Sequence, residues 1–116
     1  MPFQNVETST FTIPTFSTTT THDYNLGRLE NSNPAYGLAL QATVTFGTAS
    51  TAVLKLQASN DGVNFADVPG SSITLSASGS TIWDAGNPNY KFLRVSFAPS
   101  GGSISAVLVL NAVNLS

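Results

Sequence analysis

From Gly37 onward, apolar side chains recur at every second position, and this period decides which folds the chain can form. In residues 37–46 (GLALQATVTF) the apolar set alternates with Ala, Gln and Thr, and residues 51–59 (TAVLKLQAS) repeat the pattern. The members of the set are Leu38, Leu40, Ala42, Val44, Phe46, Ala52, Leu54, Leu56 and Ala58. No segment shows a convincing period of about 3.6 residues, which an amphipathic helix requires. The pattern therefore predicts strands that each bury one face.

Turn-forming residues separate the alternating segments at intervals of roughly 8–12 residues, which is typical of antiparallel all-β domains. Residues 47–50 (GTAS), 59–64 (SNDGVN) and 99–103 (PSGGS) are clear examples. Gly62, which follows Asp61, supplies the positive φ that a tight reversal needs. The sequence predicts an antiparallel β-sandwich, jelly-roll-like or Ig-like, of about seven to eight strands.

The first 36 residues lack this alternation. Phe3, Phe11, Ile13 and Phe16 are scattered among Thr, Ser and Asn, and Pro14 interrupts the one short piece with strand character. We expect residues 1–36 to form an extended N-terminal arm that packs on something else, and residues 37–116 to form the sandwich domain. The alternative is a floppy terminus.

Charged residues make up 9% of the 116 residues, whereas a typical domain has about 25%. With four Lys and Arg and a net charge of −2, the chain lacks the basic cluster that nucleic-acid binding requires. It has no cysteine, which excludes disulfides, thiolate metal sites and thiol catalysis. No apolar run reaches about 18 residues, so we expect no contact with a membrane. So little charge indicates a surface that other subunits cover.

Two predicted strands near the C-terminus are apolar on both faces. Val107 and Val109 lie opposite the core face of the last strand, and Tyr90 and Phe92 lie opposite the core face of the strand before it. A two-layer sandwich covers one face of each strand, so the arm or a neighbouring subunit must cover the other. We therefore expect a homo-oligomer, and specifically a trimer. The predicted interface residues are Phe3, Phe11, Ile13, Phe16, Tyr90, Phe92, Val107 and Val109.

The reactive groups form no convincing catalytic pattern. His22 is the only histidine, and Asp23 beside it would point to the opposite side of an extended chain. Asp67 and Asp84 are carboxylates that could face each other across strands, as glycoside hydrolysis requires, but nothing in the sequence demands it. We expect no enzymatic activity and no cofactor.

The sequence suggests two further kinds of binding site, for calcium and for sugars. The cluster of Asn60, Asp61 and Asn64 offers oxygens to calcium but lacks the regular calcium-loop spacing, so Asp61 suits a local turn role and we expect no metal site. Exposed aromatic rings stack on sugars, although a buried core position is the commoner role for tryptophan. The aromatic residues available for sugar binding are Trp83, Tyr36 and Tyr90.

Residues 54–113 carry a longer pattern: LQ-x-SNDG-x-N-aromatic-x-D-V-PG, then a hydroxyl-rich strand, W-D, N-Y-K-aromatic-x-R-V and a final apolar strand. This pattern resembles small β-rich structural proteins of tailed bacteriophages. Its SNDG part also resembles discoidin-type sandwiches, where the loop is a structural hairpin. The resemblance implies that Phe65 and Trp83 pack between the sheets, and that residues 90–95 form a central strand.

The same resemblance implies a function. It indicates a capsid decoration (cement) protein, made in the host cytoplasm, that sits on the virion surface as a homotrimer and clamps neighbouring major capsid proteins. The extended arm would thread across those neighbours. The alternatives are a tail or head–tail connector component and a carbohydrate-binding module.

Overall fold

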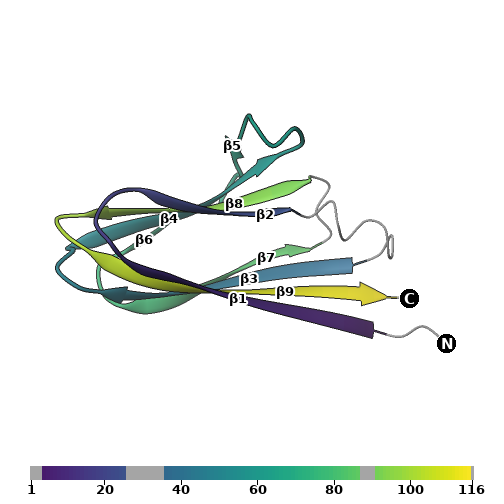
Figure 1. Cartoon of the computed structure of the whole chain (residues 1–116), viewed down its shortest axis with the longest axis horizontal. Helices are drawn as coiled ribbons and strands as arrows, with labels where there is room; N and C mark the ends of the chain where they lie inside the picture. The colour runs from purple at the N-terminus through teal and green to yellow at the C-terminus, as the bar shows by residue number, and fades with distance from the viewer. Residues whose placement is uncertain (1–3, 26–35, 87–90, 116) are drawn as a thin grey trace.

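The computed structural model describes residues 4–25, 36–86 and 91–115, and the regular elements within these ranges are β-strands (Figure 1). The strands are β1 (Gln4–Phe16), β2 (Thr20–Asn25), β3 (Tyr36–Phe46), β4 (Thr51–Ser59), β5 (Ala66–Asp67), β6 (Ile73–Leu75), β7 (Gly79–Gly86), β8 (Phe92–Ser100) and β9 (Ile104–Leu115). Within the same ranges, no helix has the length and apolar character to cross a membrane.

The strands form two sheets that face each other. The four-stranded sheet has the order β1-β9-β3-β7, and the five-stranded sheet has the order β2-β8-β4-β5 with β6 also pairing with β4. All pairings are antiparallel. Successive long strands alternate between the sheets, which is the winding of a jelly roll. The predicted all-β sandwich is confirmed, and of its two named forms the chain adopts the jelly roll.

The core lies between the sheets and follows the two-residue period of the sequence. On β4, Ala52, Leu54 and Leu56 are buried as predicted and alternate with half-buried outward side chains, whereas Ala58 is half-buried. Burying a Leu or Phe side chain contributes about 1.5–3 kcal/mol, so this layer is the main source of stability. The buried apolar residues are Ile13, Leu38, Leu40, Ala42, Val44, Ala52, Leu54, Leu56, Trp83, Leu93, Val95, Phe97, Ile104, Ala106, Leu108 and Leu110.

Most of the predicted N-terminal arm belongs to the sandwich, so the boundary at residue 36 is wrong. β1 pairs with β9 from Gln4 opposite Leu115 to Phe16 opposite Ile104, and β2 pairs with β8 along its whole length. Both are edge strands that place few side chains in the core, which is why their sequence shows weak alternation. Pro14 lies where the β1 register shifts. Residues 1–3 and 26–35 of the predicted arm lie outside the described residues.

Two turns close one end of the sandwich and hold each other. The N–H of Gly47 donates to the carbonyl of Ser103, and the N–H of Ser50 donates to the carbonyl of Ser100, each at 2.9 Å. Gly102 has a φ of 152°, and a Cβ added there would overlap the backbone of Thr48. This contact requires glycine at position 102.

Candidate assembly surfaces

The outer face of the four-stranded sheet is lined by short polar and aliphatic side chains. The strand register aligns them in rows across β1, β9, β3 and β7. Hydroxyl and amide groups bond within the rows: Thr8 Oγ1 donates to Asn111 Oδ1 at 2.6 Å, and the Thr43 and Ser80 hydroxyls are 2.9 Å apart. The uncharged face, as we name it, consists of Thr8, Thr10, Thr12, Ala39, Gln41, Thr43, Ser80, Ile82, Val107, Val109 and Asn111.

Val107 and Val109 lie in the middle of the uncharged face and are half-buried. Ile82, on the edge strand β7, lies in the same row as Val109 with Gln41 between them, and it is 66% exposed. Asp84 places a carboxylate at the margin, opposite Ala39. The last strand is therefore apolar on its outer face at these two valines, as expected. That another subunit covers this face stays a prediction.

Charged side chains gather instead on the outer face of the five-stranded sheet. Arg94 forms a two-pronged ion pair with Asp23, with its Nε 2.7 Å from Oδ1 and its Nη2 3.0 Å from Oδ2. This bond holds the pKa of the Asp23 carboxyl below its ordinary value and raises that of Arg94. Hydrogen bonds from Gln57 and Lys55 likewise lower the pKa of Asp67. The two outer faces thus differ in charge.

Phe65 belongs to this charged face. The guanidinium carbon of Arg94 lies 3.7 Å from the centroid of the Phe65 ring, a cation–π contact. The prediction that Phe65 packs between the sheets is wrong, because Arg94 alternates outward from Leu93 and Val95 and holds the ring outside. Phe92, a predicted interface residue, also lies outward on β8 and is half-buried. Tyr90, another, lies outside the described residues, as does Phe3.

Aromatic side chains line the edge where β1 and β2 face each other, which we call the β1–β2 edge. The Phe11 ring stacks on His22 with centroids 3.9 Å apart, and His22 meets Tyr24 edge-to-face at 4.8 Å. Phe11 is 41% exposed. Phe16 is half-buried with its ring 6.0 Å from that of Phe97, as part of the packing around the core.

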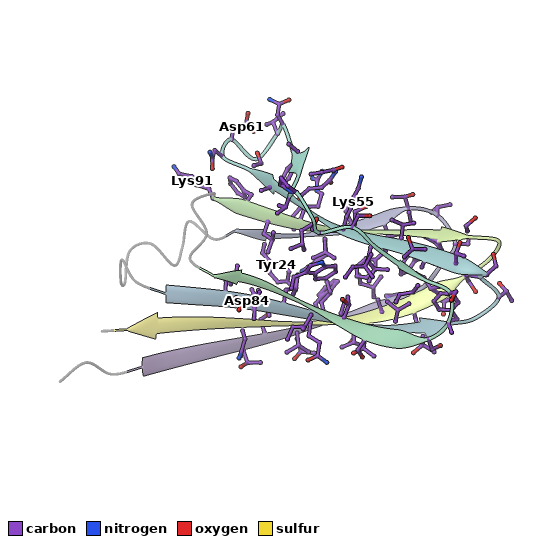
Figure 2. The ribbon with its side chains drawn as sticks, turned by 180° about the vertical axis from the view of Figure 1, so that it is seen from behind. Tyr24, Lys55, Asp61, Asp84 and Lys91 are labelled. Carbon is purple, nitrogen blue, oxygen red and sulfur yellow. The ribbon has the colours of Figure 1, made fainter. Side chains whose placement is uncertain are left out.

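Burial shifts the pKa values of two side chains at the β1–β2 edge. It lowers the pKa of His22, although Asp23 pulls the other way. It raises the pKa of Tyr24 to about 12, and Figure 2 shows this side chain between the sheets. The Tyr24 hydroxyl is buried, with no hydrogen-bond partner among the residues described. Ile13, predicted at an interface, is 5% exposed and belongs to the core of its own chain, because its side chain faces inward on β1.

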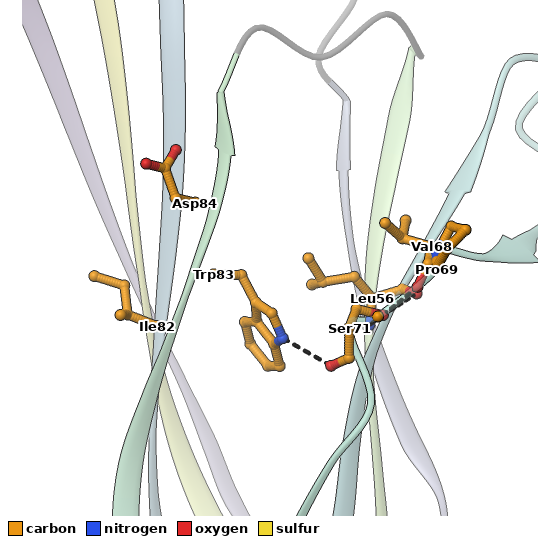
Figure 3. Close-up of a pocket in the computed structure, with 8 residues that line it drawn as sticks. Leu56, Val68, Pro69, Ser71, Ile82, Trp83 and Asp84 are labelled. Atoms are coloured by element: carbon orange, nitrogen blue, oxygen red, sulfur yellow. Dashed lines mark hydrogen bonds between the residues drawn. The ribbon is translucent and has the colours of Figure 1, made fainter.

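The opposite edge of the sandwich contains a pocket of about 440 Å³, which we call the Trp83 pocket (Figure 3). It lies between β7 and residues 68–71, which follow β5. Trp83 is 8% exposed and its Nε1 donates to the Ser71 carbonyl at 2.8 Å. The Ser71 hydroxyl in turn accepts from the Leu56 N–H at 3.1 Å and donates to the Val68 carbonyl at 2.7 Å.

The position of Trp83 between the sheets is confirmed. A tryptophan that stacks on a sugar needs an exposed ring face, and this one is buried. The structure gives the carbohydrate-binding alternative no support at this residue. The side chains of Tyr36 and Tyr90 lie outside what the structure describes.

The loop at Asp61 is a hydrogen-bonded turn. Asp61 accepts from the N–H groups of Val63 and Asn64, each at 2.8 Å, and from the Ser59 hydroxyl. The N–H groups of Asn64 and Val63 hold the pKa of the Asp61 carboxyl far below its usual range. Gly62 has the predicted positive φ, 78°. These bonds confirm the turn role expected for Asp61, and no group of three metal-binding side chains occurs in the described ranges.

The residues considered for catalysis lie apart. His22 points inward to Phe11, whereas Asp23 points outward to Arg94, as expected for neighbours in a strand. Asp67 lies on β5 of one sheet and Asp84 on β7 of the other.

No known family model matches the sequence, and no curated protein is detectably similar to it. Solved structures share the fold at low identity. The SPBc2 prophage-derived protein YomS has a TM-score of 0.61 at 10% identity, over 92% of this chain and 95% of that one. A protein of the disulfide-linked pili of Bacillus endospore appendages has a TM-score of 0.53 at 14% identity, over 99% and 89%.

A chain of the T13 IBDV viral particle has a TM-score of 0.54 at 14% identity, over 92% of this chain and 31% of that chain. At such identities the likeness shows the fold and nothing finer. The chain is an all-β jelly-roll sandwich, similar in fold to a prophage-derived protein and to part of a protein of a viral particle.

Proposed function

We propose that this chain is a non-enzymatic structural protein of a phage virion, a capsid decoration (cement) protein. It is made in the host cytoplasm, forms homo-oligomers, specifically trimers, and clamps neighbouring major capsid proteins on the shell surface. The observation that carries the proposal is the uncharged face of the four-stranded sheet, because a face of this kind suits burial against another protein.

The physical reason lies in the cost of desolvation. Burying a charged side chain without ideal partners costs several kcal/mol, and the central part of protein interfaces is accordingly poor in charge. The hydroxyl rows of the uncharged face already bond one another, and Val107, Val109 and Ile82 add apolar area. The ion pairs Asp23–Arg94 and Lys55–Asp67 lie on the other sheet, which suits contact with water. We therefore assign the uncharged face to the shell.

The structural comparisons support a viral setting for this fold, and they do not identify the role of this chain within a virion. YomS is prophage-derived, and the IBDV chain belongs to a viral particle, so this sandwich occurs in both settings. The sequence pattern of residues 54–113, which resembles small structural proteins of tailed bacteriophages, also supports a role in a virion.

The first test locates the protein in particles produced by the genome that encodes it. Purified particles are analysed by quantitative mass spectrometry and imaged by electron cryomicroscopy. The proposal expects many copies per particle, with density on the shell. A few copies confined to the tail or neck would favour the connector alternative, and absence from the particles would refute both.

The second test measures binding to shells that have been stripped of this protein. Val109→Glu places a charge in the centre of the uncharged face and is expected to weaken binding at least tenfold, which corresponds to about 1.4 kcal/mol. Val53→Glu is the matched control, since Val53 is half-buried and faces outward on β4 of the other sheet. Equal effects of the two substitutions, at equal folding stability, would refute the assignment of this face.

A further inference from the structure

We propose that copies of this chain join edge to edge, with β1 of one copy pairing with β7 of the next and Phe11 filling the Trp83 pocket. This inference rests on the proposed assembly role and names its self-contact. The occupant of the pocket is thus a second copy, and the four-stranded sheets of adjacent copies become one continuous sheet.

The two edge strands are available for pairing. β1 and β7 are the outer strands of the four-stranded sheet, at its two sides in Figure 1, and each has a neighbour on one side only within the described residues. Free strand edges are templates for pairing, and proteins usually protect them with charged side chains, proline or bulges. β1 has such protection at Pro14 and the register shift after Ile13, and β7 has it at Asp84. Residues 8–13 and 80–83 carry no charged residue and no proline, and these are the parts of the two edges that we expect to pair.

The strand directions suit a head-to-tail contact. Because every pairing in the sheet is antiparallel, β1 and β3 run one way while β9 and β7 run the other. A second copy in a similar orientation therefore brings its β1 antiparallel to β7. Such a contact joins two different surfaces, and it closes into a ring when each copy is rotated relative to the last.

The side chains match across this contact. Phe11 and Trp83 both lie on the inner side of the four-stranded sheet, since one reaches His22 on β2 and the other reaches Ser71, whose hydroxyl bonds β4 of the opposite sheet. In a shared sheet both side chains therefore point to the same side. Phe11 keeps one ring face on His22, and its exposed part, 41% of the residue, faces the next copy.

The size of the pocket also fits. An apolar cavity of about 150 Å³ holds a benzene molecule. The Trp83 pocket, at about 440 Å³, has room for the exposed part of a phenyl ring, and Leu56, Val68 and Pro69 supply apolar walls. The contact would close the open edge of each core with an aromatic residue from its neighbour.

Disulfide trapping tests this contact directly, because the chain has no cysteine of its own. With Phe11 opposite Trp83, Thr12 of one copy lies opposite Ile82 of the next. Thr12→Cys and Ile82→Cys proteins are mixed and oxidised with copper phenanthroline. We expect a mixed dimer to form at least tenfold faster than dimers within either variant. The control mixture replaces Ile82→Cys by Val53→Cys and should not cross-link at that rate.

Equal cross-linking in the control, or rapid cross-linking of Thr12→Cys with itself, would overturn the proposal. Phe11→Ala is expected to raise the dissociation constant of the oligomer at least tenfold in a protein that still unfolds cooperatively. An unchanged constant would also overturn it. Repeating the cross-linking in proteins that also carry Val109→Glu distinguishes the self-contact from shell binding. These proteins should still form the mixed disulfide dimer but should no longer bind the shell. Shell binding that depends on Val109, without any cross-link, would refute the self-contact alone.

Discussion

At the scale of single residues, the unusual positions are aromatic or ionisable groups at the open edges of the core. His22 is one of them: it is held between Phe11 and Tyr24, and its charged form is disfavoured by burial. A group of this kind makes stability depend on pH in a range where ordinary carboxylates do not titrate.

The first prediction concerns this pH dependence. The unfolded chain binds a proton on His22 near pH 6.5, whereas the folded chain, with its lowered pKa, resists protonation. The contribution of His22 is therefore complete above pH 6.5 and is lost as the pH falls below that value. Urea denaturation between about pH 8 and 5 should show this decline in the native protein. His22→Gln should show a flatter profile, and an identical decline would contradict the prediction.

The second prediction concerns Trp83. Removing this buried side chain and its bond to Ser71 is expected to lower the free energy of unfolding by about 3–5 kcal/mol in Trp83→Ala. The matched control is Ile82→Thr, which changes the exposed neighbour and keeps a β-branched residue, with an expected effect within about 0.5 kcal/mol. Chemical denaturation followed by circular dichroism measures both. Similar losses in the two variants would show that Trp83 is not a core residue.

At the scale of elements, the turn at Gly102 allows a sharp comparison. Gly70 and Gly102 both have positive φ, but a Cβ on Gly70 meets nothing within 4 Å, whereas one on Gly102 overlaps Thr48. Gly70→Ala is expected to cost about 1 kcal/mol from backbone strain. Gly102→Ala should cost about 1–3 kcal/mol more, because the turns at 47–50 and 100–103 must separate. Equal denaturation midpoints for the two variants would contradict this account.

The strands that the sequence predicts well are those buried deeply on one face. The alternation at Leu38–Val44 and Ala52–Leu56 identified β3 and β4, because every second side chain there meets the opposite sheet. Only a short piece of β1, before Pro14, is predicted as a strand, and β2 is not predicted, because edge strands bury few residues, Ile13 among those of β1. Phe65 was misplaced because the resemblance matches residue types along the chain, and it does not show that Arg94 holds this ring on the outer face.

The candidate surfaces were predictable only in part. The last strand showed Val107 and Val109 opposite its core face, so their place on an outer face followed from the period alone. The pocket at Trp83 could not be predicted from the period, because it forms only when the fold brings Leu56, Val68 and Trp83 together from separate strands and loops. The uncharged face likewise depends on the order β1-β9-β3-β7, which local patterns do not specify.

At the scale of the whole molecule, the distribution of charge separates the surfaces by role. The sheet that ends in β1 and β7 carries the uncharged face and both edges of the proposed self-contact, whereas the resolved ion pairs lie on the other sheet. One sheet can thus bind the shell through its face and bind copies of itself through its edges, while the other remains in water.

This division predicts how salt affects the oligomer. Salt screens exposed charges, with a Debye length of about 30 Å at 0.01 M and about 3 Å at 1 M. A contact between β1 and β7, built from backbone bonds, Phe11 and apolar walls, has little charge to screen, and excluded salts such as sulfate strengthen apolar burial. Sedimentation velocity in sodium chloride from about 0.01 M to about 1 M should therefore show an unchanged oligomer, and sodium sulfate should make the oligomer tighter. An oligomer that dissociates as salt rises would instead be held by ion pairs, and the assembly would then have to involve the Asp23–Arg94 face. Asp23→Asn separates these outcomes, since it should leave the salt profile unchanged if the edges make the contact.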